Sequence, residues 1–313
     1  MCVLGGFATL LVAGGVIKEG YDAHYFDGYD PALPLNAVVR GEEDRDGYRR
    51  VDCVFQGTEL TRVPTLLALP ENGTAPFPCV IFLHGIGQSK GFLDDIAAYF
   101  TRAGFALASF DQYTRGERKL VDAGLVEKAL SIRRRAALNV IETRRLVDYL
   151  QTREDIAHDR IYLVGASFGA ITGSNATAFE PRIRAAVLTY GGGNLDLLLS
   201  SEPARRELGV FHWPVKQILL YITAPAEPLL HVAQISPRPV LFQNGSHDQI
   251  IPVEAAKALV DAAGEPKTFV LYDSDHVGLD EEQTRQVLTE AVDWLKDQDR
   301  RLTLASVSRP VPR

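Results

Sequence analysis

The sequence predicts an α/β protein built on a doubly wound, mostly parallel sheet of eight strands. Two short antiparallel strands open the pattern, and solid apolar runs follow, as expected of strands that are covered on both faces. Apolar residues at helical spacing occupy the stretches between those runs. Repeated strand, helix, strand units of this kind form a parallel sheet with helices on both faces.

The elements can be followed in chain order. The two antiparallel strands are Val51 to Phe55 and Val63 to Leu69, and a turn-rich link follows them at residues 70–78. Helices are predicted after the third strand, before and after the fifth strand, and at the end of the chain. The six further strands are predicted at residues 79–83, 105–110, 161–164, 185–190, 239–242 and 268–272.

The predicted division of the chain is an apolar N-terminal segment, an irregular lead-in, one α/β domain that contains a cap insertion, and a C-terminal tail. These cover residues 1–20, 21–50, 51–298 and 299–313. Residues 1–17 carry no charge, which leaves three interpretations: a membrane anchor or export segment shortened at its start, an interfacial helix, or a piece packed on the domain. The first is favoured, so we expect an anchored or exported protein, with a cytoplasmic location as the alternative.

An apolar insertion interrupts the alternation of strands and helices between Gly191 and His231. Long bare loops are uncommon inside compact domains, so the insertion is predicted to be a small helical cap. Phe211 and Trp213 within it are candidates to line a substrate pocket below.

Composition excludes several classes of function. A net charge of −7, from 33 basic and 40 acidic residues, argues against nucleic-acid binding. The basic run Arg133 to Arg135 is interpreted as a solvated face at the start of a helix. The three cysteines lack CxxC spacing, and no HExxH motif or phosphate-binding loop occurs, so neither a metal nor a cofactor is expected. The sequence makes no prediction of oligomeric state.

A nucleophile is predicted at Ser167. It lies in Gly165-Ala166-Ser167-Phe168-Gly169, directly after a predicted strand and at the start of a predicted helix. In that context the tight turn exposes the hydroxyl, and the small flanking residues allow the chain to bend. A Gly-rich packing turn is the alternative reading.

A serine hydroxyl needs a base to remove its proton, and His276 is the predicted base. It follows the last predicted strand, and Asp248 follows the strand before it. Because the carboxyl ends of parallel strands share one edge, Ser167, Asp248 and His276 are expected to converge there. His247 is an alternative base, and Asp275 could tune the imidazole of His276.

The tetrahedral intermediate of acyl transfer needs two hydrogen-bond donors for its oxyanion. His84-Gly85-Ile86-Gly87-Gln88 follows a predicted strand, and its glycines allow the main chain to approach a substrate oxygen. The backbone amides of Ile86 and Phe168 are therefore the predicted pair. His84 is expected to brace the loop by hydrogen bonds.

These motifs together resemble the α/β-hydrolase superfamily, and in particular the bacterial esterases related to dienelactone hydrolases and acetyl xylan esterases. The resemblance covers about residues 50 to 298 and implies a Ser-His-Asp triad made of Ser167, His276 and Asp248, with no cofactor. Dienelactone hydrolases themselves carry cysteine as nucleophile, so serine here points to ordinary carboxylic esters. The resemblance rests on five motifs, which are His84 to Gly87, Asp111 with Arg115 to Arg118, Gly165 to Gly169, Asn244 to Asp248 and Asp273 to His276.

The leading functional prediction is a carboxylic ester hydrolase that forms an acyl-enzyme and acts on short-chain or small esters. A peptidase or amidase for small substrates, other α/β-hydrolase chemistry on the same triad, and a binding protein that kept the fold are the alternatives. Tyr113 and Arg115 are further candidates for the substrate pocket. Arg115 and Arg118 could bind an acidic substrate, but salt bridges to Glu117 are the favoured reading.

Overall fold

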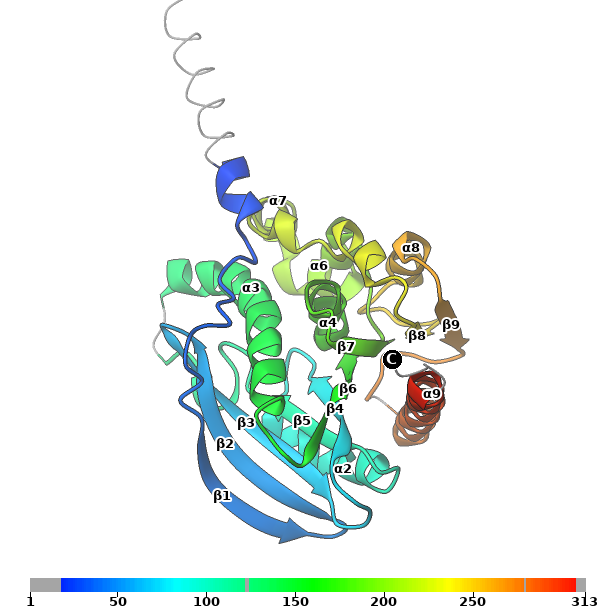
Figure 1. Cartoon of the computed structure of the whole chain (residues 1–313). Helices are drawn as coiled ribbons and strands as arrows, with labels where there is room; N and C mark the ends of the chain where they lie inside the picture. The colour runs from blue at the N-terminus through cyan, green and yellow to red at the C-terminus, as the bar shows by residue number, and fades with distance from the viewer. Residues whose placement is uncertain (1–17, 122–123, 279, 308–313) are drawn as a thin grey trace, which may run out of the picture.

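The computed structural model describes residues 18–121, 124–278 and 280–307. Its centre is one sheet in the order β1-β2-β3-β5-β4-β6-β7-β8-β9 (Figure 1). The strands β1, β2, β3 and β5 pair antiparallel in that order, and all pairs from β5 to β9 are parallel. The bounds are β1 Val38–Arg45, β2 Tyr48–Thr58, β3 Thr61–Pro70, β4 Phe77–Leu83, β5 Ala106–Phe110, β6 Ile156–Ala166, β7 Ile183–Thr189, β8 Val240–Gly245 and β9 Lys267–Tyr272.

The predicted fold class is confirmed, but the predicted number of strands is wrong. Nine strands form the sheet in the described part of the chain, because β1 lies in what the sequence predicted to be an irregular lead-in. All eight residues of β1 are exposed, so the strand lacks the apolar alternation by which a half-buried strand is recognised. Backbone pairing with β2 and cross-strand ion pairs hold it, such as Arg40 with Asp52 at 2.6 Å.

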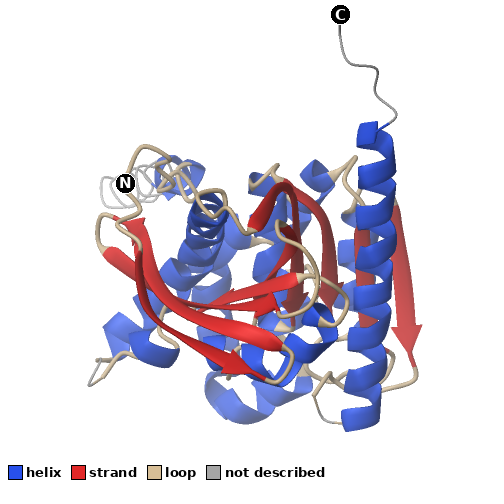
Figure 2. Ribbon diagram, turned by 60° about the horizontal axis from the view of Figure 1, so that its bottom comes forward, coloured by secondary structure: helices blue, strands red, loops and turns tan. Residues whose placement is uncertain are grey.

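Helices cover both faces of the sheet, as Figure 2 shows from a second direction. On one face α3, α4 and α8 pack on the larger apolar core, and on the other face α2 and α9 pack on a second core. The bounds are α2 Leu93–Thr101, α3 Leu125–Leu150, α4 Phe168–Phe179, α8 Val253–Ala262 and α9 Glu281–Val307. The last helix therefore continues into the predicted C-terminal tail.

The segment between β7 and β8 forms the small helical cap. It contains α5, α6 and α7 and several turns of 3₁₀ helix, and α7 lies beside the helical turn at residues 18–23 (Figure 1). The bounds are α5 Leu195–Leu199, α6 Glu202–Leu208 and α7 His212–Thr223.

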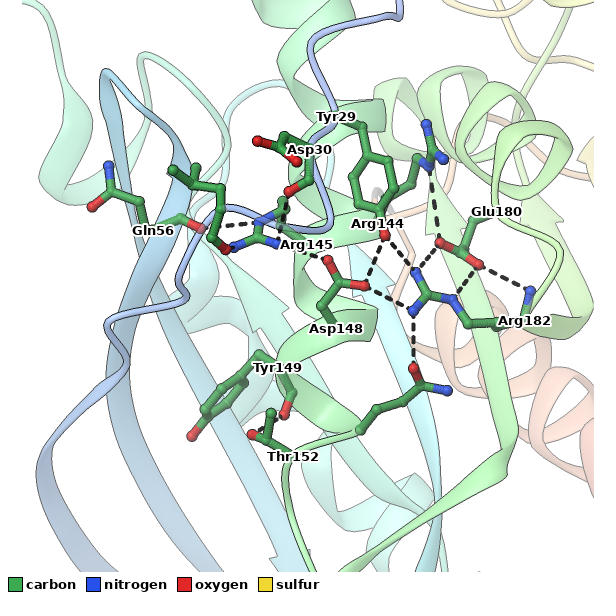
Figure 3. Close-up of polar contacts among 12 residues, drawn as sticks. Tyr29, Asp30, Gln56, Arg144, Arg145, Asp148, Tyr149, Thr152, Glu180 and Arg182 are labelled. Carbon is green, nitrogen blue, oxygen red and sulfur yellow. Dashed lines mark hydrogen bonds and ion pairs between the residues drawn. The ribbon is translucent and has the colours of Figure 1, made fainter.

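The lead-in is attached to α3 by a polar network (Figure 3). Arg145 on α3 is only 1% exposed and donates hydrogen bonds to the carbonyls of Asp30, Leu33 and Gln56. Its guanidinium also pairs with the carboxylate of Asp148 at 2.9 Å. These bonds satisfy a buried charge and fix the course of the chain before β1.

The basic run on α3 differs from its predicted solvated role. It lies in the middle of the helix, where Arg133 pairs with Asp22 at 2.8 Å and stacks on Tyr25. Arg135 is buried, and only Arg134 is exposed. Of three consecutive residues on a helix, one can face the core because of the helical periodicity. A prediction based on charge alone does not take this into account.

Among the described residues, no helix is both long enough and apolar enough to cross a membrane. Residues 1–17, for which the sequence leaves three interpretations, lie outside the described part.

Candidate active site

The site lies where the strand order changes direction. From β4 the chain crosses to β5 on one side of it and later returns to β6 on the other side. The loops that follow β4 and β6 therefore lie side by side at the carboxyl edge of the sheet. Such a switch point is where open α/β sheets bind their ligands.

Ser167 occupies a strained turn between β6 and α4. Its φ is 55° and its ψ is −120°, a conformation that non-glycine residues rarely adopt. A Cβ at Gly169 would lie 1.9 Å from the carbonyl oxygen of Leu83, and one at Gly165 would lie 2.4 Å from the carbonyl oxygen of Gly169. Only glycine fits at these two positions, which lets α4 begin against β4 and exposes the Ser167 hydroxyl.

The structure brings the three predicted triad residues together. The Ser167 hydroxyl lies 2.9 Å from Nε2 of His276, and Nδ1 of His276 lies 2.6 Å from Oδ2 of Asp248. In the tautomer that fits both contacts, Nδ1–H donates to the carboxylate and Nε2 accepts from the serine. This chain joins the ends of β6, β8 and β9.

Asp248 and His276 are held in place by their surroundings. The second carboxylate oxygen of Asp248 accepts hydrogen bonds from the amides of Ile250 and Ile251, at 2.8 and 2.9 Å. Tyr190, directly after β7, packs edge-on against the imidazole of His276 with ring centroids 5.6 Å apart. Sequence reasoning missed this contact, because Tyr190 looks like one more apolar residue of a predicted strand.

The alternative base, His247, lies on the outside of this arrangement. Its Nε2 contacts Asp273 at 2.7 Å, and both side chains are exposed. His247 lies in the turn after β8, where successive side chains point in different directions, so Asp248 points inward while His247 does not.

The loop after β4 carries Ile86, one of the two predicted oxyanion residues. Gln88 shapes this loop, since its side-chain oxygen accepts a hydrogen bond from the Gly85 amide at 2.9 Å. The buried His84 contacts the Gly85 carbonyl at 2.9 Å, and burial lowers the pKa of its imidazole to about 4. His84 is therefore neutral at neutral pH and braces the loop.

Gln112 is a residue whose role sequence reasoning missed. It follows β5, is fully buried, and donates to the carbonyl oxygen of His84 at 2.8 Å. Its own side-chain oxygen accepts from Asn139 at 3.0 Å and Arg135 at 3.1 Å, both on α3. The β4 loop is thus tied to a helix that lies beyond it in the sequence.

A cavity of about 260 Å³ lies beside Ser167 and His276. Its walls are mainly apolar, from β4, the β9 loop and the start of α9. Residues that line it include Phe82, Ile86, Phe92, Ile250, Val287 and Leu288.

A second cavity, of about 320 Å³, lies under the cap, and we call it the cap cavity. It is bounded by α3, α4, α5 and α7. Ile86 lines both cavities and is 56% exposed, and Phe168 lines the cap cavity. The two predicted oxyanion residues therefore stand between the serine and the space below the cap.

The structure does not bring the predicted pocket aromatics of the cap into either cavity. Phe211 is 67% exposed and Trp213 is 69% exposed, and neither lines the space near Ser167. Leu195, Leu198 and Leu219 form the inner face of the cap instead. The sequence identifies an apolar insertion but does not give the rotation of its helices.

The predicted pocket residues Tyr113 and Arg115 lie in the loop after β5 and line neither cavity. Tyr113 stacks against the guanidinium of Arg118 at 5.5 Å. Arg115 is half-buried, and its Nε has no hydrogen-bond acceptor among the described residues.

The ion pairs of this loop differ from the expected bridges to Glu117. Arg118 pairs with the fully buried Glu142 on α3 at 2.6 Å. Glu117 instead binds Arg40 and Lys90, and hydrogen bonds from these two cations lower the pKa of its carboxyl to about 2.

Within residues 18–121, 124–278 and 280–307, no cluster of three or more His, Cys, Asp or Glu side chains could hold a metal ion. Both described cysteines, Cys53 and Cys79, are free and buried.

The sequence is similar to those of known proteins. Residues 63–297 match the model of the dienelactone hydrolase family. The esterase YjfP of Escherichia coli is 28% identical over 220 residues, which cover 67% of this chain and 85% of that protein.

Two solved structures share the fold at lower identity. The acetyl xylan esterase 1 of Thermoanaerobacterium sp. superposes with a TM-score of 0.69 at 17% identity, over 87% of this chain and 93% of that one. An acetyl xylan esterase of Paenibacillus sp. gives 0.68 at 16% identity, over 89% and 93%.

Proposed function

The chain belongs to the dienelactone hydrolase family, and on that premise we propose that it is a carboxylic ester hydrolase with Ser167 as nucleophile, His276 as base and Asp248 as the orienting acid. The observation that carries the proposal is the unbroken hydrogen-bond chain from Asp248 through His276 to Ser167, at 2.6 and 2.9 Å. The esterase relatives support ester hydrolysis as the reaction class.

The reaction begins at the serine hydroxyl. Ser167 Oγ attacks the ester carbonyl while Nε2 of His276 takes its proton, and the Asp248 carboxylate stabilises the imidazolium that forms. The Ile86 and Phe168 amides donate hydrogen bonds to the oxyanion. His276 then gives the proton to the departing alcohol, and an acyl-enzyme remains.

Water completes the cycle. His276 removes a proton from a water molecule that attacks the acyl carbonyl, the oxyanion is held as before, and the bond to Ser167 breaks as the serine regains its proton. The products are a carboxylic acid and free enzyme. His276 must be unprotonated at Nε2 in both halves of the reaction, so acid inhibits turnover.

Covalent labelling tests the nucleophile. A fluorophosphonate is expected to label wild-type protein at Ser167, and Ser167→Ala is expected to remove both labelling and roughly 10⁴-fold or more of ester turnover. Ser246→Ala is the matched control, because Ser246 follows β8 at the same edge of the sheet, and the hydrogen bonds of His276 within the described residues go to Ser167 and Asp248. Full activity in folded Ser167→Ala protein contradicts the proposal.

Small esters are the proposed substrates. The cavities of about 260 and 320 Å³ hold short chains, and each methylene that fits adds about 0.8 kcal/mol, or roughly fourfold in kcat/KM. We expect acetyl to hexanoyl p-nitrophenyl esters to be hydrolysed faster than dodecanoyl esters. A maximum at ten carbons or more contradicts this. A panel of matched anilides measures the competing amidase activity.

A further inference from the structure

The cap cavity is apolar apart from a few groups on α3, α4 and α7. Arg135 is the one charged side chain among the described residues that line it. The hydroxyls of Thr172 and Thr223 donate to carbonyls of their own helices, so they are already used. An ester bound at Ser167 that extends past Ile86 and Phe168 enters this space.

Arg135 is buried and incompletely bonded. It is 6% exposed, its Nη2 donates to Gln112 at 3.1 Å, and its guanidinium lies 4.4 Å from the centre of the Phe168 ring. Its Nε is buried and has no hydrogen-bond acceptor among the described residues. Phe168 directly follows the serine, so this guanidinium lies close to the reacting centre.

Carboxylates of the loop after β5 and of α3 already have other partners. Asp111 accepts the amides of Lys90 and Glu117, both at 2.9 Å. Glu117 binds Arg40 and Lys90, and Glu142 binds Arg118. Within the described residues, Arg135 therefore has no carboxylate partner.

A second cation, Arg115, acts on Arg135. Burial and the positive charge of Arg115 both lower the pKa of Arg135, and an arginine still remains protonated at neutral pH. The Nε of Arg115 is also buried and has no acceptor in the part of the chain that the structure describes. A buried cation without a counter-ion costs several kcal/mol, and an anion placed beside it offsets that cost.

We propose that the cap cavity is an anion subsite, in which Arg135 binds the carboxylate of an ester that carries a second, acidic group. The inference rests on the proposed esterase function, since it names the substrate class of that same site. A guanidinium binds carboxylates through charge-assisted hydrogen bonds, and within the described residues that of Arg135 makes a single hydrogen bond, to Gln112. Arg115 adds a long-range positive field without lining the cavity.

Matched ester pairs test this subsite. Monomethyl glutarate against methyl pentanoate places the acid on the acyl side, and 4-acetoxybutanoate against butyl acetate places it on the alcohol side. The kcat/KM of each is measured by titrating released acid, in wild-type protein and in Arg135→Met, Arg135→Lys and Arg134→Met. Arg134 is the control because it is the same residue type next in the chain, exposed to solvent.

The expected result is a change in selectivity. Arg135→Met lowers kcat/KM about 10- to 100-fold for the acidic ester of one pair, chiefly through KM, and changes its neutral partner less than threefold. Arg135→Lys retains part of the preference, and Arg134→Met retains all of it. The pair that responds identifies the side of the ester that carries the acid.

A purely structural role for Arg135 gives a different outcome. If Arg135→Met lowers the acidic and neutral esters alike, or leaves their ratio unchanged in both pairs, the inference is overturned. Calorimetry with Ser167→Ala adds a readout without turnover: glutarate is expected to bind and to lose at least tenfold in affinity when Arg135→Met is added. If neither the acidic nor the neutral esters are hydrolysed, the proposed function fails, and glutarate binding still decides the anion subsite.

Discussion

Two buried arginines on α3 have opposite surroundings. Arg145 lies under the lead-in, where three carbonyls and the Asp148 carboxylate use its donors (Figure 3). Arg135, nearly three turns earlier on the same helix, lines the cap cavity and makes one hydrogen bond within the described residues, while its buried Nε has no acceptor there.

The difference separates polar groups that hold the fold together from those available to a ligand. A buried charge whose donors are all paired fixes its neighbours, and its loss leaves their polar atoms unpaired. When a buried charge has few protein partners and lies beside a cavity, its removal leaves few polar atoms of the protein unpaired. The Ser167, His276 and Asp248 chain is a third case, complete in its contacts and yet exposed to a cavity on one side.

The largest expected effect separates catalysis from stability. Asp248→Asn keeps an oxygen for the amides of Ile250 and Ile251 but presents an NH₂ group to His276, which favours the wrong tautomer. We expect kcat/KM to fall roughly 10³- to 10⁴-fold, as such substitutions do elsewhere. The thermal midpoint should change little. His247→Ala, the neighbouring control, is expected to stay within threefold of wild type.

For Arg145→Met we expect the loss to fall on stability. This change leaves three carbonyls without that donor and removes one of the cations that pair with Asp148, so the free energy of unfolding should fall by about 3–5 kcal/mol. Denaturant titration measures it, with Arg135→Met as the matched comparison. Arg135→Met is expected to cost about 1 kcal/mol or less, because it also removes the repulsion from Arg115. Equal losses in the two variants would mean that both arginines act structurally.

A smaller effect, visible as a dependence on pH, is expected at Glu117. Hydrogen bonds from Arg40 and Lys90 lower its pKa to about 2, below the usual 4.5. Its contribution to stability is therefore complete above about pH 4.5 and is lost as the pH falls toward 2. The group is partly exposed and screened, so Glu117→Gln should cost roughly 1 kcal/mol or less at pH 7. The difference in the free energy of unfolding between the variant and wild type should shrink as the pH falls from about 4.5 toward 2. A difference that stays constant across that range contradicts the prediction.

The smallest effect is expected on the outer face of the cap. Trp213→Ala should change stability by about 0.5 kcal/mol or less and leave kcat/KM for small esters within twofold, because the ring is exposed and lines neither cavity. Leu219→Ala, on the inner face of the same helix, is the contrasting variant and should alter chain-length preference. A large loss of activity in Trp213→Ala would contradict this expectation and support the aromatic pocket predicted from the sequence.

The regular elements were predictable from the sequence where burial is strong. The parallel strands from β4 onward read as apolar runs because both of their faces are covered. The first strand was missed for the opposite reason, since all its residues are exposed and carry no periodic signal. Exposed edge strands depend on backbone pairing, which side-chain patterns do not record.

Local sequence by itself determined the Gly165 to Gly169 turn and the positions of Ser167, Asp248 and His276 at strand ends, because strand ends and tight turns depend on residues close in the chain. Only the tertiary structure decided which partners lie across the sheet. It placed Tyr190 on His276, paired Arg118 with Glu142, turned Phe211 and Trp213 to solvent, and left Arg135 open to the cap cavity. Those outcomes depend on helix rotation and on contacts between distant segments, which a linear pattern of residue types does not specify.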